Sequence, residues 1–378
     1  MRGDEIAEAV LAREEVLRYI RGAEGESPHQ AEARVQAYLD ELRTTQRYRM
    51  YRALQHPLYP ILRKIERRQE HIEHAQAAVA AGRRIIYASN HKSHIDYLVQ
   101  PLVLDDNGVR PPVIAAGINL FGGALGLLHR HVTGAIPIRR DMRDPAYLAT
   151  LKAYISELLR RHDLFLYLEG GRSYSGELKP FKTGLLHAAA QARRSETVVI
   201  PVAIAYDFVV VDDILARQRV KRGQRAFARE VAEMVRYAVG YQSRAVVNFG
   251  APLALGDCDP DDRRSMLQLS RRLRADIGRL YKVLPSALVS AAMRPSIGRS
   301  ELEERIDRLI AILEMAGANL DVHSGREAVD AAAEAMEARG IIVIQGDRHR
   351  IRQRNVLRYY SRTIQHLLSD RGHSALTH

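Results

Sequence analysis

The sequence predicts an α/β fold in which a central, mostly parallel sheet is flanked by helices. Short apolar segments alternate with amphipathic segments through the middle of the chain, and such strands pair in parallel beneath helices on both faces. With 378 residues, 46% hydrophobic and 27% charged, the chain can form two or three domains around a substantial core. We expect an N-terminal helical region at 1–78, the α/β domain at 79–283 and a C-terminal helical extension with a small hairpin at 284–378.

The elements are predicted in chain order. Residues 1–78 are charged and helical in pattern, with breaks at Gly22–Pro28 and Pro57–Pro60. Six apolar strands follow, at 83–89, 113–116, 135–139, 164–168, 197–205 and 245–249. Asp144 and Pro145 supply an N-cap and a proline at the first position of a helix between the third and fourth strands. Further helices are predicted at 183–194, 224–240 and 262–281.

The pattern changes from about residue 284. An amphipathic helix at 302–313 is followed by a second at 325–339, closed by Gly340, and by a hairpin of 341–344 with 349–352. Helix, helix, hairpin is the order of a winged helix, so a basic nucleic-acid-binding protein is one alternative function. The second helix is acidic, however, and would repel phosphates; its charged residues are Glu327, Asp330, Glu334 and Glu337 against Arg326 and Arg339. We therefore expect no nucleic-acid partner.

Charge and cysteine content indicate the kinds of partner and the cellular compartment to expect. A formal charge of +12 favours anionic partners, whether phosphorylated substrates, nucleic acid or an acidic membrane face. One cysteine allows no intramolecular disulfide and fits a reducing cytoplasm, and Met1–Glu5 lacks the apolar core of a signal peptide. The uncharged, glycine-rich segment at 117–126 is either a membrane-surface contact or a buried segment. The basic tract at 217–229 is either a membrane-docking face or a solvated surface.

A turn between the first predicted strand of the α/β domain and its helix carries the residues best suited to chemistry. His91 lies in this turn, and Asp96 follows five residues later, where its carboxylate can fix the imidazole tautomer and stabilise the protonated ring. Ser93 and Asp96 also fit a helix cap, in which the acid only satisfies backbone donors. His91 and His94 with Asp96 match no strong metal-binding pattern, and we expect no metal.

Three other stretches carry candidate binding residues. Arg139 follows an apolar strand at the place where open α/β sheets form their ligand crevice, and a guanidinium there can bind a phosphate. The segment after the 164–168 strand combines a carboxylate, two glycines that allow close approach to a ligand, and cations; its candidate residues are Glu169, Gly170, Gly171, Arg172, Ser173 and Lys182. The strand with Pro201 is typical of a core wall, and Cys258 lies between carboxylates that disfavour a nucleophilic thiolate.

Four stretches in order resemble the sequence blocks of glycerolipid acyltransferases: NHKSHID, GAIPIRRD, EGGRSYSGELKPFKTG and VIPVAIAYD. The third is most similar to the branch that acylates glycerol 3-phosphate or dihydroxyacetone phosphate. The resemblance spans about residues 83–210, and the ending from Leu357 to Leu368 is also similar to that branch. Two departures stand out: Tyr174 occupies a position where the branch usually has arginine, and the chain is shorter than the large bacterial members.

The resemblance implies a fold, a reaction and roles for the residues. His91 would be the general base and Asp96 its partner, while Arg139, Glu169, Gly170, Arg172 and Ser173 match positions that bind the glycerol phosphate, and Pro201 matches the last block. The implied reaction transfers a fatty acyl group from acyl-CoA or acyl-carrier protein to glycerol 3-phosphate, without a metal, a cofactor or a covalent intermediate. Within the family, the alternative acceptor is lysophosphatidate. The protein would act at the cytoplasmic face of an anionic membrane, as a peripheral protein.

Overall fold

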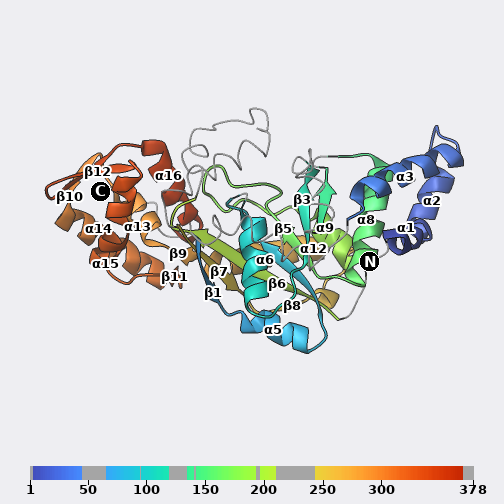
Figure 1. Ribbon diagram of the computed structural model, residues 1–378, viewed down its shortest axis with the longest axis horizontal. Helices are drawn as coiled ribbons and strands as arrows, with labels where there is room; N and C mark the ends of the chain where they lie inside the picture. The colour runs from blue at the N-terminus through green and yellow to red at the C-terminus, as the bar shows by residue number, and fades with distance from the viewer. Residues whose placement is uncertain are drawn as a thin grey trace.

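The computed structural model describes residues 3–44, 65–93, 95–118, 134–139, 142–192, 196–209 and 243–368 (Figure 1). The predicted helix at 224–240, the basic tract at 217–229 and the glycine-rich segment from residue 119 onward lie outside these residues. In the described part of the chain, no helix combines the length and the apolar character needed to cross a bilayer.

The central sheet has eight strands in the order β1-β7-β6-β2-β5-β3-β4, with β8 added on β6. Five neighbouring strands run parallel; they are β2 (Arg84–Ser89), β3 (Val113–Gly117), β4 (Ala135–Ile138), β5 (Leu164–Tyr167) and β6 (Thr197–Tyr206). Beyond β6, β7 (Ser243–Phe249) and β8 (Leu253–Ala254) are antiparallel to it, and β1 (Ile65–Glu70) is parallel to β7. The six predicted strands and the mostly parallel sheet are confirmed.

Helices cover both faces of the sheet. Because successive side chains of a strand point to opposite faces, neighbouring residues belong to different cores. Ile85 and Tyr87 of β2 belong to one core, with α5 (Glu73–Ala80) and α6 (Asp96–Asp106). Ile86 and Ala88 belong to the other, with α8 (Pro145–Leu159), α9 (Gly184–Ala190) and α12 (Arg263–Leu280). This double burial explains why β2 and β6 are continuously apolar rather than alternating. The predicted N-cap is also present, since Asp144 accepts the Ala146 N–H at 2.9 Å.

One element of the N-terminal region differs from its prediction. Residues 65–70, predicted as part of a helical segment, form the edge strand β1, which pairs with β7 from Ile65 opposite Ser243 to Glu70 opposite Asn248. Its sequence, IERRQE, is charged because an edge strand keeps much of its surface in water, so no strand-like apolar pattern marks it. The predicted helices before it are present as α1 (Gly3–Leu11), α2 (Glu14–Gly22) and α3 (Pro28–Leu42), which pack against α8 (Figure 1).

The C-terminal part adopts the winged-helix order of elements and lies at the opposite end of the molecule from α1 to α3 (Figure 1). Three short strands form an antiparallel sheet in the order β10-β13-β12. The elements are α13 (Pro285–Ala292), β10 (Ser296–Gly298), α14 (Arg299–Met315), α15 (Gly325–Ala338), β12 (Ile342–Gln345), β13 (Arg348–Ile351), α16 (Arg354–Thr363) and α17 (Gln365–Leu368). The two predicted helices and the hairpin are confirmed; α13, β10, α16 and α17 were not predicted.

The winged-helix part is continuous with the central domain. Its buried side chains share one core with α6 and with strands of the central sheet. A short parallel pair, β9 (Lys282–Val283) with β11 (Asn319–Leu320), lies at the junction, where Glu70 of β1 accepts hydrogen bonds from Lys282 and Asn319. The two parts therefore cannot separate without breaking buried contacts.

Candidate functional site

The turn between β2 and α6 (residues 90–95) is anchored to β6. Asn90 is fully buried, and its side chain donates to the Ile204 carbonyl at 2.9 Å and accepts the Ile204 N–H at 2.8 Å. The amide thereby continues the strand pairing for one residue past the end of β2. This anchor places the next residue, His91, at the carboxyl edge of the sheet, as expected from the parallel strands.

The His91 and Asp96 side chains meet in this turn. Nδ1 of His91 lies 2.8 Å from Oδ2 of Asp96, and the imidazole of His91 stacks on the ring of Tyr167, with centroids 4.4 Å apart. Among the described residues, Nε2 of His91 has no hydrogen-bond partner. A carboxylate acceptor at Nδ1 fixes the tautomer in which Nε2 carries the free lone pair. The ring is thus arranged to accept a proton at Nε2.

Asp96 is fully buried and accepts three further hydrogen bonds. Its Oδ2 takes the backbone N–H groups of Lys92 at 2.7 Å and Ser93 at 3.0 Å, and its Oδ1 takes the Tyr206 hydroxyl at 2.7 Å. Burial raises the pKa of Tyr206 well above its ordinary value, which keeps this hydroxyl a donor. The bond from Ser93 matches one half of the predicted capping pattern, but α6 begins at Asp96 with Ile95 as its N-cap and without a side-chain cap. Asp96 therefore serves the turn and the imidazole together.

The loop between β5 and α9 (residues 168–183, here the β5–α9 loop) holds the backbone of His91 on both sides. Glu169 Oε1 accepts the His91 N–H at 3.0 Å, and the Ser173 N–H donates to the His91 carbonyl at 2.9 Å. Glu169 Oε2 accepts the Lys179 N–H at 3.2 Å. Glu169 thus joins the turn to the loop through main-chain groups. Ser173 is also buried, and its hydroxyl donates to the Glu177 carbonyl at 2.6 Å.

Cations gather around one aromatic ring in this loop. Arg172, itself buried, lies with its guanidinium carbon 5.2 Å from the centre of the Tyr174 ring, and Lys179 Nζ lies 5.6 Å from the same centre. Lys179 Nζ also donates to the Arg172 carbonyl. Tyr174, at a position where the resembled acyltransferase branch usually has arginine, lies beside both cations. A small anion would meet both charges here.

The two glycines and Lys182 shape the start of the loop. Gly170 has a φ of +67°, and a Cβ at this position would lie 2.6 Å from Cδ of Lys182. Only glycine adopts this conformation readily and leaves room for the lysine stem. The Lys182 N–H donates to the Leu168 carbonyl at 2.7 Å, which closes the loop beneath Gly170 and Gly171.

Lys92 joins the same loop and was not singled out by the sequence. Its side chain is buried, Nζ donates to the Gly176 carbonyl at 2.6 Å, and the ammonium lies 5.2 Å from the centre of the Tyr281 ring. Burial lowers the pKa of Lys92. In the sequence, a lysine next to a candidate base gives no signal of a particular role. Its role in linking the turn, the loop and Tyr281 depends on contacts between segments far apart in the chain.

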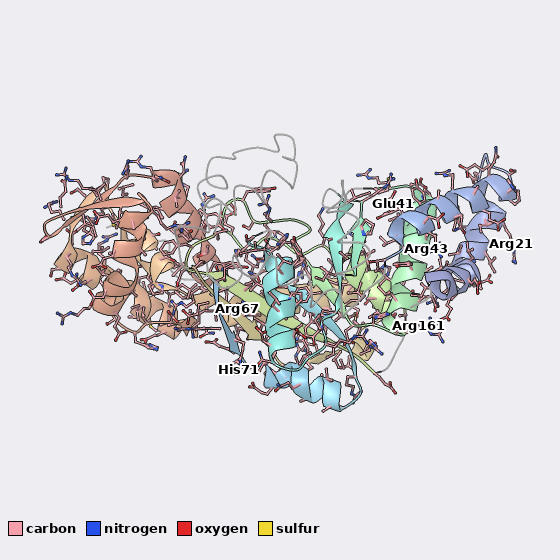
Figure 2. The ribbon with its side chains drawn as sticks, in the orientation of Figure 1. Arg21, Glu41, Arg43, Arg67, His71 and Arg161 are labelled. Atoms are coloured by element: carbon pink, nitrogen blue, oxygen red, sulfur yellow. The ribbon has the colours of Figure 1, made fainter. Side chains whose placement is uncertain are left out.

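Arg139 and Pro201 are placed differently from the other candidates. Arg139 lies at the end of β4, on the same edge of the sheet as His91, but β4 is three strands from β2, roughly 14 Å at the usual strand spacing. Figure 2 labels Glu41 on α3. Its carboxylate pairs with the Arg139 guanidinium at 2.7 and 2.5 Å, and this pairing raises the pKa of Arg139. Pro201 lies within β6 opposite Ala88, and its carbonyl accepts the Gly250 N–H, as in a core wall.

The remaining alternatives involve metal and cysteine. His94 lies outside the described residues, and among those that are described no three His, Cys, Asp or Glu side chains are placed to hold a metal ion. Cys258 follows β8, which pairs with β6 near Val198, whereas Tyr206 ends β6. Eight residues of strand separate Val198 from Tyr206, roughly 26 Å. The thiol is therefore at the opposite edge of the sheet from His91.

Comparison with known proteins identifies sequence relatives of the chain. Residues 66–205 match the protein family described as Acyltransferase. A glycerol-3-phosphate acyltransferase of Aeromonas hydrophila is 32% identical over 243 residues, covering 62% of this chain and 30% of the relative. Those of Haemophilus influenzae (strain PittEE) and Pasteurella multocida are each 28% identical, covering 76% of this chain and 39% and 40% of the relatives. The chain thus spans between 30% and 40% of the length of these relatives.

One solved structure, the 1-acyl-sn-glycerophosphate (LPA) acyltransferase from Thermotoga maritima, aligns with 73% of this chain and 96% of its own at 15% identity and a TM-score of 0.37, which is too low to establish a common fold. An imidazole held by a buried carboxylate at the carboxyl edge of a parallel sheet places the protein among α/β proteins equipped for acid–base chemistry. Its central part is similar to the Acyltransferase family, and larger stretches of the chain are similar to glycerol-3-phosphate acyltransferases.

Proposed function

We propose that the protein transfers a fatty acyl group from an acyl thioester to a hydroxyl of glycerol 3-phosphate, an early step of phospholipid synthesis. The observation that carries the proposal is the buried pair of His91 and Asp96, in which Nε2 of His91 has no hydrogen-bond partner among the described residues. The names of the sequence relatives support glycerol 3-phosphate as the acceptor.

In the proposed reaction, Nε2 of His91 accepts the proton of the acceptor hydroxyl while the hydroxyl oxygen attacks the thioester carbonyl. Asp96 stabilises the imidazolium that forms, and Tyr206 and two backbone N–H groups keep the carboxylate in place. When the carbon–sulfur bond breaks, the leaving thiolate takes up the proton from the imidazolium. An ester and a free thiol result, and no acyl group is attached to the protein.

The acceptor's phosphate is proposed to bind at Arg172 and Lys179. Both cations lie on the loop whose Glu169 and Ser173 hold the His91 backbone, so a phosphate held there keeps the hydroxyl close to the imidazole. Fixing a small acceptor in this way makes the transfer effectively intramolecular. We retain Arg139 as a second phosphate contact, which requires its guanidinium to exchange Glu41 for the substrate.

The proposed partners follow from the reaction. The acyl donor is acyl-CoA or acyl-carrier protein, and no cofactor or metal is needed beyond this co-substrate. We propose that the protein works as a peripheral protein at the cytoplasmic face of an anionic membrane, because its product is a membrane lipid and its formal charge is +12.

The test is an acyl-transfer assay of the purified protein with labelled acyl-CoA and acyl-carrier protein. Glycerol 3-phosphate, dihydroxyacetone phosphate and lysophosphatidate are offered separately. We expect the highest kcat/KM with glycerol 3-phosphate. Preferential acylation of lysophosphatidate would replace the proposed acceptor. Absence of turnover with every acceptor, while the folded protein binds nucleic acid, would favour the alternative of a nucleic-acid-binding protein.

A further inference from the structure

The winged-helix part carries a row of exposed arginines that the proposed reaction does not use. These residues, here the arginine strip, are Arg348, Arg350, Arg352, Arg354 and Arg358. Arg348 and Arg350 alternate along β13 with His349, which is buried, so both face outward from the small sheet. Arg352 continues the alternation beyond β13, and Arg354 and Arg358 lie one helical turn apart on α16.

Few acidic residues accompany the strip, either along the chain or across the small sheet. Arg350, Arg352, Arg354 and Arg358 form no ion pair within the described part of the chain, whereas Arg299 nearby pairs with both Glu303 and Asp330. On the small sheet the cross-strand neighbours are small or neutral: Ser296 and Val343 beside Arg350, Gly298 and Gln345 beside Arg348. Asp347 is the one acidic residue between 345 and 362. A flat anionic surface would meet unopposed guanidinium groups here.

The strip leads toward the candidate site. The helix α16, where the strip ends, packs against the β5–α9 loop: a Cβ on Gly176 would lie 2.1 Å from the Tyr359 carbonyl oxygen. Arg362, one turn beyond Arg358, pairs with Glu177 of the same loop at 3.3 Å. A partner seated on the strip would therefore lie beside the loop that carries Arg172 and Lys179.

We propose that the arginine strip docks the protein on an anionic phospholipid surface. The choice of lipid rests on the proposed function, because an acylated glycerol phosphate leaves the site as a membrane component. Duplex nucleic acid fits less well, since α15, the helix that a winged helix inserts into a groove, carries four acidic residues that would oppose the phosphates. A membrane meets only the outer face of the small sheet and α16.

The test compares two triple variants of the full chain. Arg350→Gln/Arg352→Gln/Arg354→Gln removes the middle of the strip. The control, Arg263→Gln/Arg264→Gln/Arg271→Gln, removes three exposed arginines of α12 that likewise form no ion pair within the described residues. Both lower the net charge equally. Binding is measured by flotation with phosphatidylglycerol–phosphatidylcholine vesicles and with phosphatidylcholine vesicles, at low and high salt.

We expect the strip variant to bind the anionic vesicles about 10- to 100-fold more weakly than the parent, and the control to bind nearly as the parent does. High salt should abolish the difference. Both variants should keep acyl transfer to glycerol 3-phosphate with acyl-CoA in detergent, which shows that they fold and keeps this test separate from that of the activity.

Three results would overturn the docking proposal. The strip variant could bind anionic vesicles like the parent, or both variants could lose binding equally, which would indicate overall charge. Alternatively, a labelled DNA duplex or acidic carrier protein could require the strip while vesicles do not. If the protein shows no acyl transfer but its binding to vesicles still depends on the strip, the docking proposal holds and the proposed activity is wrong.

Discussion

Asp96 accepts hydrogen bonds from His91, from two backbone N–H groups and from Tyr206, so its removal should affect both stability and turnover. We expect His91→Ala to lower kcat by about 10²–10⁴ with little change in Tm, because the general base is lost. Asp96→Ala should lower kcat as strongly and also lower Tm, because three further donors lose their buried acceptor. Turnover and thermal unfolding are measured together. Normal turnover in Asp96→Ala with a lowered Tm would mean that the carboxylate is only a cap.

Arg172 and Arg139 allow the acceptor site to be tested with one type of substitution. Lysine keeps the charge but not the planar, two-pronged donor, so Arg172→Lys should raise the KM for glycerol 3-phosphate about 10- to 150-fold and leave that for the acyl donor nearly unchanged. Arg139→Lys should have a smaller effect, because Glu41 already holds this guanidinium. An increase confined to the acyl donor's KM would move these arginines to the donor's phosphates.

Residue contacts could be predicted from the sequence where they are local. His91 and Asp96 are five residues apart across a recognisable turn, so their meeting follows from the turn itself. Tyr206 reaches Asp96 from 110 residues away, and Lys92 reaches Gly176 from 84 residues away. Such contacts depend on strand order, and an isolated tyrosine or lysine gives no signal of it.

At the scale of elements, the β5–α9 loop and α16 depend on a glycine. Gly176 has a φ of +88°, and a Cβ there would lie 2.1 Å from the Tyr359 carbonyl oxygen. We expect Gly176→Ala to lower Tm and turnover, because strained backbone and displacement of α16 cost about 1–3 kcal/mol. Gly317→Ala is a matched control, with a φ of +69° and open space around its Cβ. Equal loss of Tm in the two variants would indicate that strain alone is responsible and that the contact with α16 is unimportant.

Strand prediction succeeded where burial dictates composition. The apolar strands β2 to β7 are buried and could be predicted from β-prone, apolar runs. The edge strand β1 could not be predicted, because its charged residues suit a solvent-exposed helix equally well. Only the pairing with β7 selects the extended form. The strand β10 could not be predicted for a different reason, since its three residues are too few to show a period.

At the scale of the whole molecule, two histidines make stability depend on pH. Burial, the largest cause, lowers the pKa of His162 to about 4 and that of His366 to about 4. The unfolded chain, with histidines near 6.5, binds more protons than the folded one between these values, so the free energy of unfolding falls as pH drops from about 6.5 toward 4.

We therefore expect the variant His162→Gln/His366→Gln to lose less stability than the parent between pH 7 and pH 5. Urea unfolding at both pH values measures the difference. Because carboxylates contribute equally in the two proteins, the parent-minus-variant difference isolates the histidines. An unchanged difference across this range would show that neither ring is held neutral by burial.

The pairing of β1 with β7 has a consequence for how the protein is made. Glu70 and its neighbour Asn248 are 178 residues apart, and the strands between them include the whole parallel block. At about 5–20 residues per second, a ribosome needs roughly 9–36 s to deliver the partner of β1. The nascent chain must keep a charged, unpaired segment in solution throughout that interval, and charge is what prevents such a segment from aggregating. The charged composition that prevents prediction of β1 from a sequence pattern thus keeps the segment soluble until β7 has been synthesised.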